Sequence, residues 1–244
     1  MTTELRDQIE VAGITVEVRR KRIKNLHIGV YPPDGHVRVS APMRFDHEAI
    51  RLALVSRLGW IRRKRESFRT QPRQSEREMV TGESHYLQGK RYRLDVVEVP
   101  GCRHSMSVSG TDRLLLQVQP GTDRAGRVRA LHRYYRKFLQ ERIPELLAEW
   151  QPRMSVQTSE WRVKHMKTRW GSCNIAARRI WLNLELAKKS DRCLEYVVVH
   201  ELTHFLERNH TERFRSLMDE FLPDWRVRRD ELNTSPLGHE EWGY

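Results

Sequence analysis

The chain has 244 residues, of which 38% are hydrophobic and 32% charged, and its net charge is +13. This length allows one large domain or two small ones, with a core that needs neither disulfides nor metals to hold it. Three scattered cysteines exclude a disulfide framework and a four-cysteine zinc site. The polar N-terminus and the lack of a long apolar run argue against secretion and membrane insertion, so we expect a cytoplasmic protein without a membrane partner.

The basic charge is unevenly distributed along the chain. The net charge is +8 over residues 1–75, +10 over residues 76–189 and −5 over residues 190–244. A basic surface attracts polyanions without sequence specificity, so proximity to nucleic acid is one interpretation of the excess. A solvated basic surface with no dedicated partner is the other.

The first half of the sequence predicts a β-rich region with one helix. Short apolar–polar alternations over residues 9–40 predict a small antiparallel meander, with a turn at Pro32-Pro33-Asp34-Gly35. Asp46 is a candidate N-cap for a helix over residues 47–68, and strand-like runs resume over residues 86–118. We therefore predict an N-terminal β-rich region over residues 1–120.

The second half has longer helical patterns. Apolar residues recur at helical spacing from residue 123 to Trp150, and we expect Pro144 to kink or divide that helix. Two strands are predicted within residues 160–185, and Ser190 is a candidate cap for a helix over residues 191–208. These elements predict a second domain over residues 121–244. No internal repeat is evident in the sequence.

The last of these helices contains the sequence HELTH, an HExxH motif. His200 and His204 are one helical turn apart, so both imidazoles project from one face and can bind one zinc ion. Glu201 lies beside that face, where it can act as general base on a water at the metal. The alternative is a pair of hydrogen-bonded structural histidines, which the apolar run before the motif makes costly.

A third zinc ligand is needed, and His210 is the first candidate. Asn209 tolerates the left-handed conformation that turns a chain, which would bring His210 back toward the metal. His210 as a cap of the following helix is the structural alternative. Other candidates for the third ligand are the acidic residues Glu207, Asp219 and Glu220.

At this point the sequence resembles the YgjP-like metallopeptidase family, a branch of the zincins related to SprT-type proteases. The resemblance is carried by residues 166–173 (MKTRWGSC), 180–184, the motif helix 196–204, Asn209-His210 and Phe214. It extends to the N-terminal half through matches that include Pro33-Asp34-Gly35 and Trp60-Ile61, so it covers nearly the whole chain. It implies zinc ligands at His200, His204 and His210 and a catalytic base at Glu201. The implied fold is α+β, with the N-terminal β-rich region packed on a zincin-like metallopeptidase half that carries the HExxH helix.

The segment Trp170-Gly171-Ser172-Cys173 allows two interpretations. Glycine permits close backbone approach, so an edge strand here could pair with an extended peptide substrate. A packing corner filled by Trp170 is the structural alternative, and Cys173 is expected to be a small buried hydrophobe.

Three functions from different classes are compatible with these features. A zinc-dependent metallopeptidase is the first. A metal-dependent nucleoside triphosphate pyrophosphatase is the second, its phosphates held by the basic residues Arg162, Lys164, Lys167, Arg169, Arg178 and Arg179. The third is a DNA-associated accessory protein, although no zinc finger, helix-turn-helix or RNA-binding aromatic motif is present.

Overall fold

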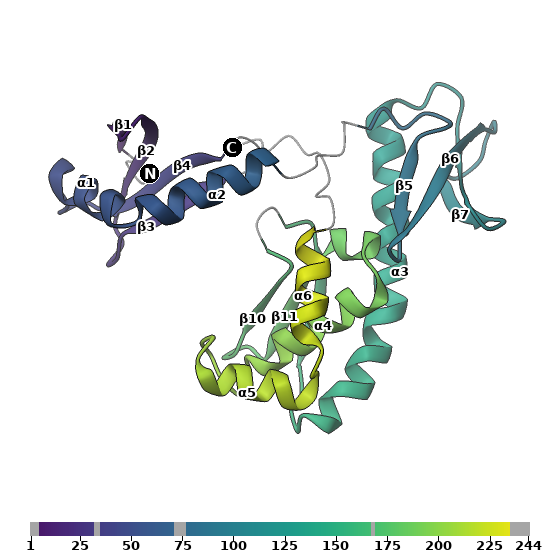
Figure 1. Cartoon of the computed structure of the whole chain (residues 1–244). Helices are drawn as coiled ribbons and strands as arrows, with labels where there is room; N and C mark the ends of the chain where they lie inside the picture. The colour runs from purple at the N-terminus through teal and green to yellow at the C-terminus, as the bar shows by residue number, and fades with distance from the viewer. Residues whose placement is uncertain (1–4, 32–34, 71–76, 167–168, 235–244) are drawn as a thin grey trace. The chain divides into compact units, whose positions relative to one another are not determined.

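The structure, a computed structural model, describes residues 5–31, 35–70, 77–166 and 169–234. The chain forms two compact units, Met1–Pro72 and Arg73–His239 (Figure 1). Each has its own hydrophobic core. Among the described residues, no helix is both long and apolar enough to cross a bilayer.

The first unit is a four-stranded sheet with two helices. Its strands are β1 (Leu5–Val11), β2 (Ile14–Lys21), β3 (His27–Tyr31) and β4 (His36–Pro42), in the order β1-β2-β4-β3. The predicted meander is wrong, because β2 and β4 are parallel neighbours. Their buried valines, Val16 with Val37 and Val18 with Val39, form adjacent pairs at the centre of the core. The predicted turn falls between β3 and β4, but Pro32, Pro33 and Asp34 lie outside the described residues.

The predicted helix of this unit is divided in two. Asp46 caps α1 (His47–Ser56) by accepting a hydrogen bond from the backbone N–H of Ala49, as predicted. Arg57 then interrupts the helical hydrogen bonding, and α2 spans Leu58–Thr70. Ile50, Leu54 and Ile61 from the two helices are buried in the core of the sheet.

The second unit begins with another four-stranded sheet. Its strands are β5 (Ser84–Leu87), β6 (Lys90–Glu98), β7 (Ser105–Ser109) and β8 (Arg113–Val118), in the order β5-β6-β8-β7. Leu94 and Leu114 from this sheet share a core with Tyr135 and Leu139 of the next helix. The predicted division at residue 120 passes through this core, whereas the boundary between the compact units is at residues 72–73.

The helix α3 (Arg124–Arg153) is the longest element of the chain. Figure 1 shows it running past the β5–β8 sheet at one end and along α4 at the other. Pro144 and Pro152 both lie inside it, so the expected division at Pro144 is wrong. Packing of Ile143, Leu146 and Leu147 into the core on either side holds this stretch helical.

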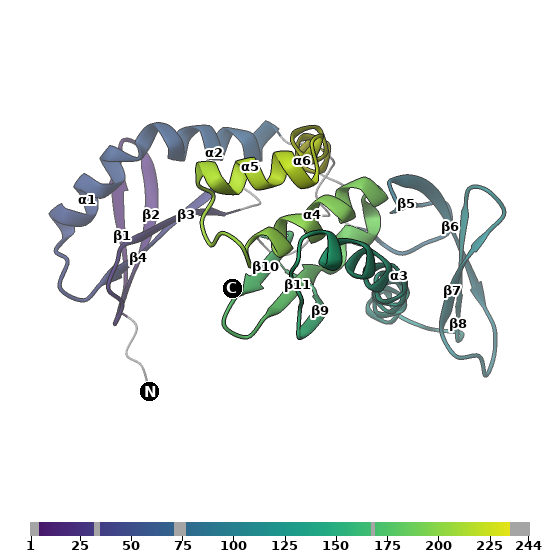
Figure 2. The same cartoon turned by 90° about the horizontal axis from the view of Figure 1, so that it is seen from below.

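The remaining elements surround the HELTH motif. They are β9 (Glu160–Lys164), β10 (Gly171–Asn174), β11 (Arg179–Asn183), the 3-10 helix η1 (Leu184–Lys188), α4 (Asp191–Thr203), α5 (Glu212–Phe221) and α6 (Trp225–Thr234). The three strands form a sheet in the order β10-β11-β9, and α4 packs against β10 and β11 (Figure 2). The motif helix ends at Thr203, five residues before the predicted end, and α6 was not predicted. The α+β fold class is confirmed, with its N-terminal β-rich region.

Candidate metal centre

Helix α4 is held firmly in the core of the second unit. Ser190 caps it by accepting a hydrogen bond from the backbone N–H of Cys193. Val197, Val198 and Val199 are buried, as expected from the apolar run before the motif. The buried Thr203 hydroxyl donates to the carbonyl of Val199, which satisfies its polar group inside the core.

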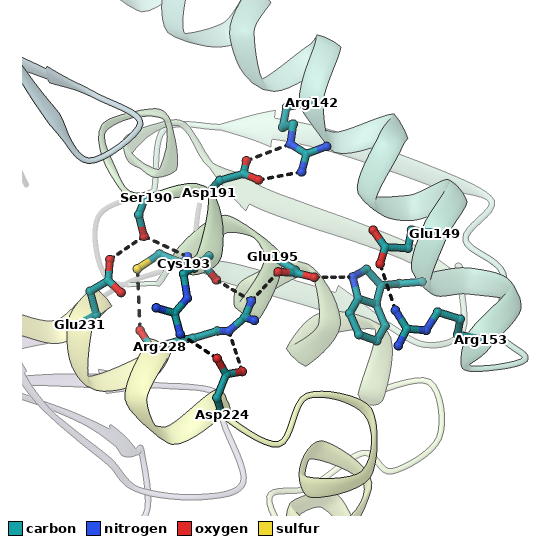
Figure 3. A network of polar contacts seen from close by, with 12 residues as sticks. Arg142, Glu149, Arg153, Ser190, Asp191, Cys193, Glu195, Asp224, Arg228 and Glu231 are labelled. Atoms are coloured by element: carbon teal, nitrogen blue, oxygen red, sulfur yellow. Dashed lines mark hydrogen bonds and ion pairs between the residues drawn. The ribbon is translucent and has the colours of Figure 1, made fainter.

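Polar contacts fasten α4 to the neighbouring helices (Figure 3). The guanidinium of Arg142 on α3 donates to both carboxylate oxygens of Asp191, over 2.8 and 2.6 Å. Glu195 on α4 accepts from the Trp150 indole at 3.1 Å and from Arg228 of α6. Helix α4 is thereby fixed on two sides by charge-assisted hydrogen bonds.

Three histidines converge at the end of this helix. The ring centroids of His200, His204 and His210 lie 4.9 to 5.0 Å apart, and their candidate ligand atoms all lie within 4.8 Å of one another. The Nε2 atoms of His200 and His210 are 3.0 Å apart. Phe214 of α5 contacts all three rings and forms the apolar floor of the cluster.

The turn that delivers His210 differs from the predicted one. Asn209 is not among the residues with positive φ, so no left-handed residue reverses the chain there. Its backbone N–H instead donates to the Glu207 side chain at 3.1 Å, and its carbonyl accepts from Thr211 at 2.7 Å. Thr211 then caps α5, so His210 lies in a short hydrogen-bonded turn between two helices.

The protonation state of His200 and His204 suits metal binding. Burial, together with the neighbouring His204 and His210, lowers the pKa of His200 to about 3, and burial also lowers the pKa of His204. Both imidazoles are therefore neutral near pH 7, with a nitrogen lone pair available. His204 Nδ1 lies 3.2 Å from the carbonyl of Glu207, which fits a donated hydrogen bond that leaves Nε2 for a metal. Three imidazoles at this spacing fit a zinc ion.

Glu201 lies beside this cluster, on the same helix. It is only 5% exposed, and burial raises the pKa of its carboxyl to about 8, although Arg169 opposes the change. Gly171 of β10 faces it so closely that a Cβ there would lie 2.7 Å from Cγ and 2.8 Å from Cδ of Glu201. The carboxyl is therefore confined between α4 and the edge strand.

The other candidate ligands lie outside the histidine cluster. Glu207 accepts from the Asn209 backbone, Asp219 pairs with Arg226 and with the Trp225 indole, and neither joins the group of potential ligands in the described residues. Glu220 is also absent from that group. Burial raises the pKa of the half-buried Cys173 to about 12, so its thiol is protonated at neutral pH.

The segment around Trp170 combines both predicted interpretations. Trp170 packs partly against the core, while residues 171–174 form β10 at the edge of the sheet. The side chain of the buried Asn183 donates to the carbonyls of Met166 and Arg169, both at 2.7 Å, and holds the approach to β10. Lys167, one of the basic residues considered as phosphate ligands, lies outside the described residues, as does Thr168.

A cavity of about 1210 Å³ opens over the histidines and Glu201. Of the basic residues predicted from the sequence, Arg169 and Arg179 line it, whereas Arg162, Lys164 and Arg178 do not. Tyr196, Arg208 and Arg229 are among the lining residues that were not predicted from the sequence. Tyr196 precedes His200 by one helical turn, a spacing that could have indicated it. Arg229 lies on the unpredicted α6 and gave no such signal.

Two solved structures and one family model are similar to this chain. Two solved structures that match are described as metallopeptidase zymogens. Abylysin of Pyrococcus abyssi is 18% identical, with a TM-score of 0.36 over 38% of this chain and 92% of its own. Jannalysin of Methanocaldococcus jannaschii is 19% identical, with a TM-score of 0.32 over 37% of this chain and 95% of its own. The search of curated proteins gives no match.

A family model provides the broader match. The model described as YgjP-like, metallopeptidase domain covers residues 24–235, which include the β-rich region from β3 onward and the histidine cluster. This range is most of the 244-residue chain. The chain therefore belongs to the YgjP-like, metallopeptidase domain family.

Proposed function

We propose that the chain is a zinc-dependent metallopeptidase in which His200, His204 and His210 hold the metal and Glu201 is the general base. The observation that carries this proposal is the convergence of three imidazoles beside one confined carboxyl. A zinc ion bound there would polarise a substrate carbonyl and lower the pKa of a water.

The residues of the chain supply the proton transfers. A carboxyl with a pKa near 8 is close enough to neutrality to accept a proton from water and to give it up again. Glu201 therefore takes the proton from the attacking water and delivers it to the amine of the leaving group. Gly171 and the wall of β10 keep the carboxyl directed at the cavity while this happens.

Metal removal and substitution test the assignment together. We expect the purified protein to bind one zinc per chain and to cleave members of a mixed peptide pool, with both properties lost after chelation. His204→Ala should lose zinc, whereas Glu201→Gln should keep zinc and lose cleavage by about a thousandfold or more. His104→Ala, a histidine outside the cavity, is the matched control and should retain both.

The same assay separates the alternative activities. Nucleoside triphosphates are included in the mixture and their products measured by mass spectrometry. Nucleotide cleavage that Glu201→Gln abolishes, with every peptide intact, would contradict the peptidase assignment. Zinc binding by the His204→Ala variant would contradict the ligand assignment.

A further inference from the structure

The charged residues that line the cavity are almost all arginines. They are Arg169, Arg179, Arg208 and Arg229, and the only acidic lining residue is Glu201 at the floor. Arg169 and Arg179 belong to residues 76–189, whose net charge is +10, whereas Arg208 and Arg229 belong to residues 190–244, whose net charge is −5. The cavity thus gathers arginines from both a basic and an acidic part of the sequence.

Two of these arginines are neutralised by the protein itself. Arg179 pairs with Glu160 at 3.3 Å and lies over the Trp181 ring, 4.7 Å from its centroid. Arg229 pairs with Asp230 at 2.9 Å and lies over the Trp225 ring. Their charge is largely balanced before any substrate binds.

Arg169 and Arg208 are different. Within the part of the chain that the structure describes, neither guanidinium forms an ion pair, although the charge of Arg169 acts on the nearby Glu201 carboxyl. They reach the cavity from separate segments: Arg169 lies two residues before β10, and Arg208 lies in the turn between α4 and His210. Both are exposed, so their guanidinium groups are accessible to a ligand.

An unpaired guanidinium at a concave surface favours a carboxylate that can accept two parallel hydrogen bonds. Low-dielectric walls, here Trp170, Trp181 and Tyr196, strengthen the field that such charges produce. We propose that Arg169 and Arg208 form a specificity subsite for acidic peptides, selecting Asp or Glu side chains next to the bond that is cleaved. This inference rests on the proposed peptidase function and names its substrate class.

A binding experiment tests the subsite without depending on turnover. Full-length, zinc-loaded Glu201→Gln protein is titrated into fluorescein-labelled decapeptides of one sequence whose central residues are Glu, Gln or Lys, and anisotropy is recorded. We expect the Glu peptide to bind about tenfold or more tightly than the Gln peptide, with the Lys peptide weakest. Arg169→Glu and Arg208→Glu, each made in the same background, should reduce that preference about tenfold.

Arg133→Glu is the matched control, since it makes the same charge change on an exposed surface of α3 outside the cavity. It should leave the preference unchanged. Circular dichroism and zinc content confirm that each variant is folded. Equal binding of the Glu and Gln peptides would overturn the proposal, and so would an Arg133→Glu effect as large as those at Arg169 and Arg208.

Two further arms separate this inference from the proposed function. In the first, a nucleoside triphosphate and unlabelled Glu peptide compete separately for the labelled Glu peptide's site. If the nucleoside triphosphate displaces the labelled peptide at a far lower concentration, the subsite binds phosphate and the proposal is overturned. Cleavage of the three peptides by the wild-type protein tests the peptidase itself. If the Glu peptide binds in a manner that depends on Arg169 and Arg208 but is not cleaved, the subsite is supported and the peptidase function is contradicted. If the peptides are cleaved with no preference for Glu, the peptidase function is supported and the subsite is contradicted.

Discussion

Gly171 occupies the point in β10 where the edge strand meets the candidate catalytic base. A side chain there would need the space now filled by Cγ and Cδ of Glu201. Its φ is not in the left-handed region, so glycine is required for space and not for backbone conformation. The close approach of β10 to α4 therefore depends on the absence of one methyl group.

Gly171→Ala should lower kcat by about ten- to a hundredfold, because the added methyl displaces the Glu201 carboxyl from its confined position. We expect zinc content to stay at wild-type level and KM to change little, which a general loss of structure would not produce. Gly59→Ala is the control, since the nearest atom to its added methyl lies 3.6 Å away. An unchanged kcat in Gly171→Ala would show that Glu201 can move without cost.

The residues of the site differ in how visible they are in the sequence. The spacing of four between His200 and His204 places both on one helical face, and this arrangement could be predicted directly. His210 lies beside His200 and His204, but through a turn other than the expected one, because capping by the Glu207 side chain replaces a left-handed Asn209. The contact of Gly171 with Glu201 arises through the tertiary packing of β10 on α4, which no local sequence pattern reveals.

Strand β2 carries an acidic residue within a basic cluster. Glu17 accepts from Arg19 at 2.6 Å, Arg38 at 2.8 Å and His36 at 3.1 Å, and its side chain is 16% exposed. Burial alone would raise the pKa of this carboxyl, but these hydrogen bonds outweigh it and lower the pKa from 4.5 to about 2. The ionised form therefore stabilises the sheet.

Because the folded pKa lies below the ordinary value, this stabilisation is complete above pH 4.5 and is lost as pH falls toward 2. Glu17→Gln should cost about 1–2 kcal/mol at pH 7, after solvent screening is allowed for, and should flatten the acid dependence of the first unit. Hydrogen exchange of peptides covering β2 and β4 measures this unit separately. Equal acid sensitivity in the variant would contradict the assignment.

The contacts between α4 and α6 predict how much Arg228 contributes to stability. Arg228 is 13% exposed and pairs with both Glu195 and Asp224, so its removal leaves Glu195 with the Trp150 indole alone. Arg228→Met should lower the free energy of unfolding by about 2 kcal/mol. Arg215→Met removes an exposed pair with Glu212 and should cost less than about 0.5 kcal/mol.

Urea unfolding followed by tryptophan fluorescence measures both variants, because five of the seven tryptophans lie within residues 150–225 of the second unit. Equal destabilisation by the two substitutions would show that the anchor contributes no more than a surface ion pair.

Element types were easier to predict than their arrangement. The caps Asp46 and Ser190 follow from local hydrogen bonding, and both were predicted from the sequence. The parallel pairing of β2 with β4 was not, because alternation in burial identifies a strand face and not its neighbours. Pro144 does not divide α3, because core packing outweighs the lost backbone hydrogen bond.

The two four-stranded sheets have the same design, although no repeat was evident in the sequence. Both have the pairing pattern antiparallel, parallel, antiparallel, in the orders β1-β2-β4-β3 and β5-β6-β8-β7. Their first hairpins turn on Ala12-Gly13 and Gln88-Gly89, each pair with positive φ at both residues, and each sheet is followed by an Asp-capped helix. The two sheets share their turns and helix caps, and this geometry allows the residues at other positions to differ widely.

Each of the two units has its own hydrophobic core, so the second unit can be tested without the first. Among the described residues, the core of the first unit is built entirely from residues 9–61 and that of the second from residues 79–232. We expect a chain of residues 73–244 to fold, to bind one zinc and to unfold at the temperature of the matching transition in the full chain, measured by calorimetry. Aggregation or loss of zinc would show that the second core depends on the first unit. If zinc is retained and peptide cleavage lost, the first unit contributes to substrate binding, because all of the proposed ligands, the base and the cavity lining lie within residues 169–233.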